Sequence, residues 1–365
     1  MVSRVGQGIG VTNPVSGVAI RAITSAVPTR VARTADYAYL SPEERARFQK
    51  ATGIAERHIV EAGQCASDLC IAAATKVLGH IGWGPTSVGA LVLITQTPDQ
   101  PVPATSIGIQ HKLGMAQDCL AFDINLGCSS YPFGLAIVSS MMKTLGIARA
   151  LLLIGDVSSL ICAMDDKGAW PLFGDAGSAT ALELDENAPP MFFDLMSDGA
   201  GKDAIIIPRG GLASRRPAGD GPVEQETDRD GVTRRPDQLI LRGADIFGFA
   251  ISKVPPSIKR VLGDADVSTE QVDFLVLHQA NKMINDTIAR KAGFGAERLP
   301  SSLERYGNTS SASIPVTLCA NAQAFSGKRN DVLLCGFGVG LSWGSALVSL
   351  SPGVVIPGIE SDHVY

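Results

Sequence analysis

The chain has 365 residues, of which 45% are hydrophobic and 18% charged, and its formal net charge is −5. This length accommodates two ordinary domains or one duplicated domain, and the composition is that of a packed globular protein. A net negative charge gives no reason to expect a nucleic-acid partner. The apolar runs Ala90–Ile94 and Ala150–Ile154 are too short to span a bilayer, and residues 1–17 lack the pattern of a signal peptide.

The seven cysteines are scattered through apolar segments, and none shows the C-x-x-C spacing of a zinc site. An odd number without regular spacing argues against a disulfide framework. We therefore expect a reduced, cytoplasmic protein without a bound metal.

The first half of the chain predicts alternating strands and helices. Residues 1–15 show no period and are expected to be loose. Alternating or continuous apolar runs favour strands, and apolar residues at helical spacing favour helices. The expected strands cover residues 18–27, 88–96, 150–157 and 173–184, and the expected helices cover residues 65–79 and 105–113. A further helix should begin after Ser41, which is a favourable N-cap followed by proline.

The second half opens with a long surface excursion at about residues 197–236, where paired glycines, arginines and prolines replace the apolar period. A strand at Gln238–Arg242 and a helix at about residues 244–262 follow, and Pro255-Pro256 should kink that helix or split it in two. Strands are also expected at Phe274–Leu277 and before the glycine-rich run at Gly336.

Two pairs of segments resemble each other across the halves. Residues 87–93 share their pattern with residues 271–277, and residues 148–155 resemble residues 329–336. Such self-similarity suggests two α/β halves of the same topology. We place the halves at residues 1–185 and 186–365.

Residues 121–135 carry the first candidate for chemistry. The pattern predicts a short strand that turns at Gly127 and leads into a helix, which would put Cys128 at the first helical turn. Unpaired amides and the helix dipole favour a thiolate there, as a covalent acyl-transfer enzyme requires. The same pattern also suits a small cysteine packed at a helix start.

Three further pieces accompany Cys128. His278 ends an apolar strand, at the edge where α/β sheets gather ligands, although it could equally be a core histidine. Asn308 lies in a turn of small residues and could be a helix cap or a polar group for charge stabilisation. The glycine-rich run from Gly336 could bring backbone amides close to a thioester carbonyl.

Together these pieces resemble the β-ketoacyl-acyl-carrier-protein synthase III family of the thiolase superfamily, over about residues 18–350. The motifs that carry the resemblance begin at six positions, which are Thr52-Gly-Ile-Ala-Glu-Arg-His, the Cys128 turn, Phe173-Gly-Asp-Ala-Gly, His278-Gln-Ala-Asn, Gly307-Asn-Thr-Ser-Ser-Ala-Ser and Trp343-Gly-Ser-Ala-Leu. The resemblance implies a thiolase-like five-layered αβαβα fold made of two duplicated halves, assembled as a homodimer.

The resemblance also implies roles for individual residues. Cys128, His278 and Asn308 would form the catalytic triad, and the backbone amides of Cys128 and Val339 would form the oxyanion hole. The substrate pocket would include positions along three segments, namely Val102, Gly338, Gly340 and position 248, a glycine between Phe247 and Phe249. Val102 stands where a partner subunit would contribute a phenylalanine, so its small side chain leaves room for a longer acyl chain.

Close relatives do not fit the same residues. A biosynthetic thiolase would need a cysteine where Gly336 stands, and Cys335 is one residue away. The elongating condensing enzymes use a second histidine where Asn308 stands. Plant-type polyketide synthases share the triad but not the Trp343-Gly-Ser ending.

The coenzyme A contacts of the family are replaced here. The residues at those positions are Arg47, Ala51, Lys167 and Met283. The acyl donor is therefore expected to bind differently or to be held by an acyl-carrier protein. A basic patch could dock that acidic carrier, although the same residues could be an ordinary solvated helix face; the patch consists of Lys253, Lys259, Arg260 and Lys282.

The sequence is compatible with three functions. The first is decarboxylative Claisen condensation of an acyl group on Cys128 with a malonyl thioester, with coenzyme A or carrier-protein thioesters as substrates and no cofactor. The second passes the same acyl group to a hydroxyl or amine, with His278 as general base. The third is a silent partner subunit that only binds or scaffolds.

Overall fold

Two sheets of related topology form the core of the molecule, for which a computed structural model describes residues 14–211, 225–227 and 232–365. The first sheet has the order β16-β1-β7-β6-β4-β5. Its strands are β1 (Val18–Val27), β4 (Ala90–Ile94), β5 (Leu120–Ile124), β6 (Arg149–Asp156), β7 (Ala176–Leu184) and β16 (Ile359–Glu360). The second sheet has the order β13-β14-β15-β8, with β8 (Phe192–Ser197), β13 (Phe274–Leu277), β14 (Asn330–Gly338) and β15 (Ser342–Leu350).

The two sheets repeat the same pairing pattern. In the first, β1 and β7 are antiparallel, β7 and β6 are antiparallel, and β6 and β4 are parallel. In the second, β8, β15, β14 and β13 follow the same sequence of directions. The two segment pairs that resemble each other in sequence are β4 with β13 and β6 with β14. The predicted duplication is confirmed.

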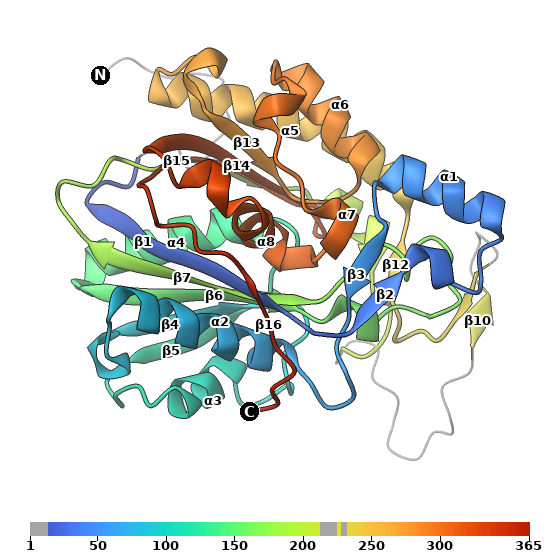
Figure 1. The fold of residues 1–365 in the computed structure, drawn as a ribbon, viewed down its shortest axis with the longest axis horizontal. Helices are drawn as coiled ribbons and strands as arrows, with labels where there is room; N and C mark the ends of the chain where they lie inside the picture. Colours follow the sequence, from blue (N-terminus) through green and yellow to red (C-terminus); the bar gives the residue numbers. More distant parts are fainter. Residues whose placement is uncertain (1–13, 212–224, 228–231) are drawn as a thin grey trace.

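Helices separate and cover the sheets (Figure 1). The outer helices of the first sheet are α2 (Ala66–Ile81) and α3 (Thr105–Lys112), and those of the second are α5 (Gly243–Ala265) and α6 (Lys282–Ala292). Between the sheets lie α4 (Ser130–Leu145) and α8 (Ser313–Ala320). This arrangement is the expected five-layered αβαβα fold. The shorter elements at the right of the view are α1 (Pro42–Thr52), α7 (Leu303–Tyr306), β2 (Val31–Arg33) and β3 (Glu56–His58).

The central strands are buried on both faces, as their continuous apolar sequences predict. In β4, Val92 and Ile94 pack into the core between the sheets, whereas Leu91 and Leu93 pack into the core beneath α2. All four are fully buried. Successive side chains of a strand point to opposite faces, so an apolar run with no alternation requires a layer on each side.

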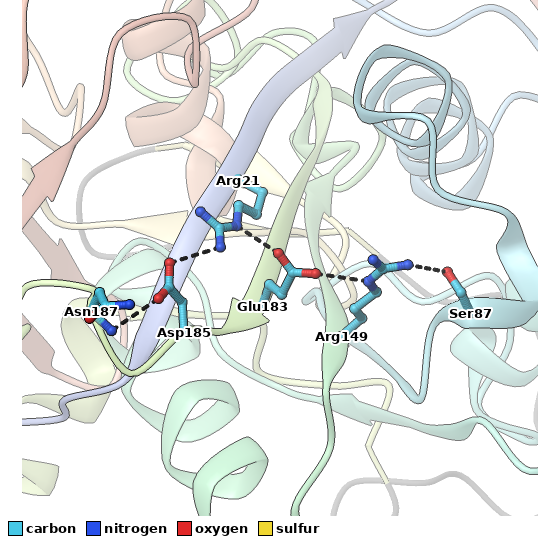
Figure 2. A network of polar contacts seen from close by, with 6 residues as sticks. All are labelled: Arg21, Ser87, Arg149, Glu183, Asp185 and Asn187. Carbon is cyan, nitrogen blue, oxygen red and sulfur yellow. Dashed lines mark hydrogen bonds and ion pairs between the residues drawn. The ribbon is translucent and has the colours of Figure 1, made fainter.

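A chain of ion pairs crosses three strands of the first sheet near one end (Figure 2). Arg21 of β1 contacts both Glu183 of β7 and Asp185, at 2.8 and 2.9 Å. Arg149 of β6 contacts the other oxygen of Glu183 at 2.9 Å and also donates to Ser87. The side chains are partly exposed, so this network fixes the relation of β1, β7 and β6 at the surface of the sheet.

Two local expectations about helices need correction. The proline pair at Pro255-Pro256 neither ends nor divides α5, which is one helix of 23 residues. Val254, Pro255, Ser257 and Ile258 are buried within the second half, so tertiary packing outweighs the two missing backbone donors. The other correction concerns Cys128, because α4 begins at Ser130 with Ser129 as its N-cap.

The excursion after β8 contains short elements rather than a featureless loop. They are the 3-10 helix Gly199–Ala204, β9 (Ile205–Ile206), β10 (Glu226–Thr227) and β11 (Thr233–Arg234). The strand expected after the excursion is β12 (Ile240–Leu241), which pairs with β9. Arg234 donates to Asp166 at 2.6 Å in a buried ion pair that anchors this segment to the first half. The parts of the excursion at 212–224 and 228–231, and most of the N-terminal stretch expected to be loose, lie outside the described residues.

Candidate active site

The turn that holds Cys128 is built by close packing against the C-terminal glycine run. A Cβ atom on Gly127 would collide with the side chains of Gln96 and Val339. A Cβ atom on Gly338 would lie 2.7 Å from both Cβ and Sγ of Cys128. Only glycine allows the two backbones to approach this closely. The predicted juxtaposition of Cys128 with this run is therefore present in the fold.

The sulfur of Cys128 is buried, with the residue 8% exposed. Burial raises the pKa of the thiol to about 11, with a smaller upward effect from the nearby Asp156 carboxylate. Hydrogen bonds from the backbone amides of Val339 and Cys128, and from the Ser310 side chain, act in the opposite direction on this pKa. The expectation that a helix start would favour the thiolate is wrong for the resting site, because desolvation outweighs these donors.

His278 follows β13 and is 2% exposed. Its Nδ1 lies 2.6 Å from the hydroxyl of Ser313, and its ring meets the ring of Phe337 edge-on at a centroid distance of 5.4 Å. Burial lowers the pKa of His278 to about 3, although a hydrogen bond to the backbone of Ser310 raises it in part. The imidazole is therefore neutral at physiological pH.

Asn308 is held by its backbone and by one side of its amide. Its N–H donates to Leu172 at 2.9 Å, and its carbonyl accepts from Gly174 at 3.0 Å. Its Oδ1 accepts from the backbone amide of Ser310 at 2.9 Å. Because the oxygen is engaged, the NH₂ end of the amide is the part left to donate elsewhere. The glycine motif at Phe173 thus serves to anchor Asn308.

Ser310 follows Asn308 closely in the chain, and its sequence pattern did not single it out. Its amide donates to Oδ1 of Asn308 at 2.9 Å. Hydrogen bonding by its side chain acts to lower the pKa of the Cys128 thiol, and hydrogen bonding by its backbone acts to raise the pKa of His278. The φ of Ser310 is +49°, a left-handed conformation that is uncommon for serine. The sequence shows only one small residue among several, so nothing in it marks this conformation.

The sequence pattern did not indicate Asp156 either, because its motif is typical of an ordinary strand end. Its carboxylate is buried at the end of β6. One oxygen accepts from the amide of Gln96 at 2.7 Å and the hydroxyl of Thr95 at 3.1 Å, and the other accepts from the amide of Ser311 at 3.2 Å. This carboxylate therefore ties the loop after Asn308 to the first sheet.

The predicted pocket residues lie in different surroundings. Gly338 contacts Cys128, whereas Gly340 is exposed. Gly248 is exposed on α5 with no atom within 4 Å of an added Cβ, while its buried neighbour Phe249 packs edge-on against Trp343. Val102 is 81% exposed and stands away from the body of its own chain.

The predicted docking residues are exposed, but two of them are already paired. Arg260 donates to both oxygens of Asp194 at 2.8 Å, and Lys282 is paired with Asp286. The ammonium of Lys253 lies 5.7 Å from the ring centroid of Trp343. Among the described residues, Lys259 has no ion pair.

The residues that replace the coenzyme A contacts lie on the surface. Arg47 and Ala51 are exposed on α1, and Met283 is 52% exposed on α6. Lys167 contacts Glu44 of α1 at 3.2 Å, so its charge is partly satisfied within the chain.

Comparisons with known proteins identify the family. Residues 122–199 match the family model of 3-oxoacyl-[acyl-carrier-protein] synthase III, and residues 262–350 match that of its C-terminal part. A β-ketoacyl-[acyl-carrier-protein] synthase III of Rhodopirellula baltica is 34% identical, over 91% of this chain and 98% of the relative. One of Acidiphilium cryptum is 31% identical, over 90% of this chain and 98% of the relative.

A solved structure agrees with this match. A 3-oxoacyl-(acyl-carrier protein) synthase of Burkholderia xenovorans LB400 superimposes with a TM-score of 0.88 at 33% identity, covering 96% of this chain and 99% of its own. The chain belongs to the 3-oxoacyl-[acyl-carrier-protein] synthase III family. The resemblance drawn from the six motifs is confirmed.

Neither a membrane-spanning helix nor a metal-binding cluster occurs among the described residues. No helix in residues 14–211, 225–227 and 232–365 has the length and apolar character needed to cross a bilayer. Over the same ranges, no three histidine, cysteine or acidic side chains cluster in a way that could hold a metal ion.

Proposed function

We propose that the protein loads an acyl group from a thioester onto Cys128 and condenses it with a malonyl thioester held by an acyl-carrier protein, with loss of CO₂. One observation carries this proposal. Gly338 of β14 lies against the Cys128 side chain, and the preceding residue, Phe337, packs edge-on against the ring of His278. The segment that follows Asn308 puts the Ser313 hydroxyl 2.6 Å from Nδ1 of the same ring. These contacts support one buried site for the nucleophile and the two polar groups.

In the loading step, the Cys128 sulfur attacks the thioester carbonyl and the donor leaves as a thiol that takes up the proton. The amides of Cys128 and Val339, whose hydrogen bonding acts to lower the pKa of the thiol, would stabilise the oxyanion that forms beside the sulfur. Such preorganised donors are typically the largest electrostatic contribution to acyl transfer.

In the condensation step, the malonyl group loses CO₂ and becomes an enolate, whose carbon attacks the acyl thioester on Cys128. If the Ser313 hydroxyl donates to Nδ1 of His278, the single proton of the neutral ring lies on Nε2. Nε2–H and the NH₂ group of Asn308 would then be two neutral donors for the enolate oxygen. Decarboxylation itself generates the carbanion, so no general base is required.

The low pKa of His278 favours this reaction over acyl transfer to a hydroxyl or amine. That alternative needs His278 to accept a proton, and burial strongly disfavours the imidazolium. The same burial does not disfavour a neutral imidazole that donates a hydrogen bond. A scaffold without activity would not need three polar groups gathered around a buried thiol.

The acyl donor and the carrier form part of the same proposal. Exposed Lys253 and Lys259 on α5 would attract an acidic carrier protein, and Arg260 would do so only in competition with Asp194. The exposed and partly paired residues at the family's coenzyme A positions favour a donor held by a carrier protein. The reaction requires no resident cofactor, and we place it in the cytoplasm.

We also propose that the working unit is a homodimer formed along β5. This strand is at the edge of the first sheet, and its backbone is free to pair with a second copy of itself. Apolar side chains are exposed on β5 and on its neighbours in sequence, with Leu120 41%, Ile107 of α3 49% and Ile137 of α4 37% exposed. Val102, which is 81% exposed, would then reach the pocket of the partner subunit.

Intact-mass spectrometry after incubation with acyl-coenzyme A and acyl-carrier-protein donors tests the loading step. We expect an adduct on the wild type that is absent from Cys128→Ala. Cys65→Ala is the matched control, because Cys65 is a more exposed thiol outside the site. The Cys65→Ala variant should still form the adduct on Cys128. The mass of the adduct identifies the acyl group.

Release of CO₂ from malonyl-carrier protein then separates the two reactions. Stoichiometric CO₂ with a β-ketoacyl product supports condensation. Transfer of the acyl group to an acceptor without CO₂ would favour the acyltransferase, and a Cys128 that no thioester acylates would rule out both.

A further inference from the structure

Asn308 is held in place by a short stretch of the first half of the chain, residues 172–174. The two segments form an isolated parallel bridge between Phe173 and Asn308. The Asn308 amide donates to the Leu172 carbonyl at 2.9 Å, and the Gly174 amide donates to the Asn308 carbonyl at 3.0 Å. The position of the Asn308 side chain therefore depends on where residues 172–174 lie.

The side chain of Arg57, from β3, holds this stretch. Its Nη1 donates to the carbonyl of Trp170 at 2.7 Å and to the carbonyl of Phe173 at 2.8 Å. The guanidinium also stacks on the Trp170 ring, with Cζ 4.3 Å from the ring centroid. Hydrogen bonds from a charged donor are stronger than those between neutral groups, so Arg57 fixes both ends of residues 170–173.

The same side chain also meets the residue before Asn308. A Cβ atom on Gly307 would lie 2.7 Å from Cγ of Arg57 and 2.8 Å from the Leu172 carbonyl oxygen. The backbone of Gly307 therefore packs directly on the aliphatic stem of Arg57, at a φ of +62° that glycine adopts readily. Arg57 thus contacts both of the segments that meet in the bridge at Asn308.

Stability alone does not account for a guanidinium in this place. Arg57 is 0% exposed, and its Nε and Nη2 are buried without a hydrogen-bond partner among the described residues. Burying a charged group whose hydrogen-bonding capacity is not met destabilises a fold, and well-packed apolar replacements of buried charges are often neutral or stabilising. The position of Arg57 therefore indicates a task beyond packing.

We propose that Arg57 is a positioning residue that fixes the place of the Asn308 amide and so acts on the condensation step. The inference rests on the proposed function, in that the NH₂ group of Asn308 is taken as a donor to the enolate oxygen. The loading step should not depend on Arg57, because its described contacts lead to Asn308 rather than to Cys128.

The two half-reactions test these expectations separately. Acylation of Cys128 is followed by intact mass, and CO₂ release is measured after malonyl-carrier protein is added to the acylated enzyme. We expect Arg57→Met to acylate at nearly the wild-type rate. Its CO₂ release should be at least about tenfold slower, since misplacing a reacting group by about 1 Å costs up to about a hundredfold. Arg57→Lys keeps a charged donor without the planar fork, so its CO₂ release should be intermediate.

Arg298→Met is the matched control. Arg298 also donates from Nη1 to two backbone carbonyls, those of Thr269 and Val272, and its guanidinium lies 4.8 Å from the ring centroid of Phe294. The substitution removes the same kinds of contact, but the described contacts of Arg298 involve none of residues 170–174. Both rates should therefore stay at the wild-type level.

Hydrogen exchange of the backbone amides adds a measurement that needs no substrate. Mass spectrometry of the peptides that carry the Gly174 and Asn308 amides reports the bridge itself. We expect these amides to exchange about tenfold faster in Arg57→Met, as for the loss of about one hydrogen bond to a charged group. Arg57→Lys carries both measurements if Arg57→Met does not fold.

The inference is overturned if an Arg57 variant with a wild-type melting temperature releases CO₂ at the wild-type rate or shows unchanged exchange. It is also overturned if acylation and CO₂ release fall together, as a merely structural role requires, or if Arg298→Met slows CO₂ release equally. A wild type that releases no CO₂, or an Asn308→Ala variant that releases it at the wild-type rate, would contradict the proposed function instead. The exchange measurement then decides by itself whether Arg57 positions Asn308.

Discussion

Burial sets the chemistry of individual residues in this site. Cys128 and His278 are both shifted towards their neutral forms, with pKa values of about 11 and about 3. A thiol that is rarely ionised needs donors close to its sulfur, and a histidine that is rarely protonated is suited to donate rather than to accept a proton.

At the scale of single residues, we expect Gly338→Ala to abolish acylation of Cys128. The new methyl group would sit 2.7 Å from Cβ and Sγ of Cys128, so the nucleophilic side chain must shift from its position. We expect acylation of Cys128 to fall at least about a hundredfold, as loss of an oxyanion-hole donor does. Gly79→Ala on α2 is the control, because its added Cβ meets no atom within 4 Å. Near-normal acylation of Gly338→Ala would contradict the close packing.

His278 also predicts how stability depends on pH. Its pKa of about 3 in the folded protein lies below the value of about 6.5 in an unfolded chain, so the unfolded state binds a proton first as the pH falls. The stability it contributes is therefore present above about pH 6.5 and is lost towards lower pH, by about 1.4 kcal/mol per pH unit. Urea unfolding of wild type and His278→Asn between pH 4.5 and 7.5 measures the difference.

The difference in unfolding free energy between wild type and His278→Asn isolates the effect of His278, because the carboxylates titrate in both proteins. The wild type should lose stability more steeply than His278→Asn over this range. Parallel curves would show that His278 is accessible to protons. The same pKa predicts that the condensation rate has no inflection near pH 6.5 from this residue.

At the scale of elements, packing decides what local sequence leaves open. Helix α5 contains two prolines yet runs unbroken for 23 residues, because its apolar face is buried in the second half. In addition to their apolar contacts in the core, the ends of the strands β1, β7 and β6 are joined by partly exposed charges (Figure 2). Such a network should contribute little at each pair and more as a set.

Glu183→Gln tests this network. Partial burial acts to raise the pKa of Glu183, but hydrogen bonds from Arg149 and Arg21 lower it overall. Its stabilising contribution is therefore present at neutral pH and lost as the pH falls through that lowered pKa. Urea unfolding at pH 7 should show a loss of about 1 kcal/mol, and less in 1 M NaCl.

Glu186→Gln is the matched control, since Glu186 is 81% exposed and its one ion pair among the described residues is with Lys143. It should change the free energy of unfolding by less than about 0.5 kcal/mol. A salt-independent loss in Glu183→Gln would indicate packing rather than charge.

At the scale of the whole molecule, the proposed homodimer depends on the exposed edge of the first sheet. Ile107→Glu places a charge next to β5 at a side chain that is 49% exposed, so the fold of the single chain should be kept. We expect light scattering to show a shift from dimer to monomer at micromolar concentration. Met283→Glu, at an equally exposed apolar position on α6, should remain dimeric. A monomeric wild type would contradict the proposal.

Much of the architecture followed from sequence patterns. Continuous apolar runs identified β4 and β6 as strands buried on both faces, and the Ser41 cap placed the start of α1. The duplication was visible because equivalent strands have equivalent surroundings in the two sheets and so require the same residue pattern. The triad residues could be named because each lies in a motif at a strand end or turn.

The amino-acid sequence by itself determined the family and the layered fold, and it predicted Cys128, His278 and Asn308 as the catalytic residues, since these depend on local patterns and motif spacing. The tertiary structure alone decided their ionisation, because desolvation depends on all the neighbours of a group and not on its position in a helix. It also decided the positions of Ser310 and Asp156. The left-handed backbone of Ser310 and the contacts of the Asp156 carboxylate arise only where the two halves meet.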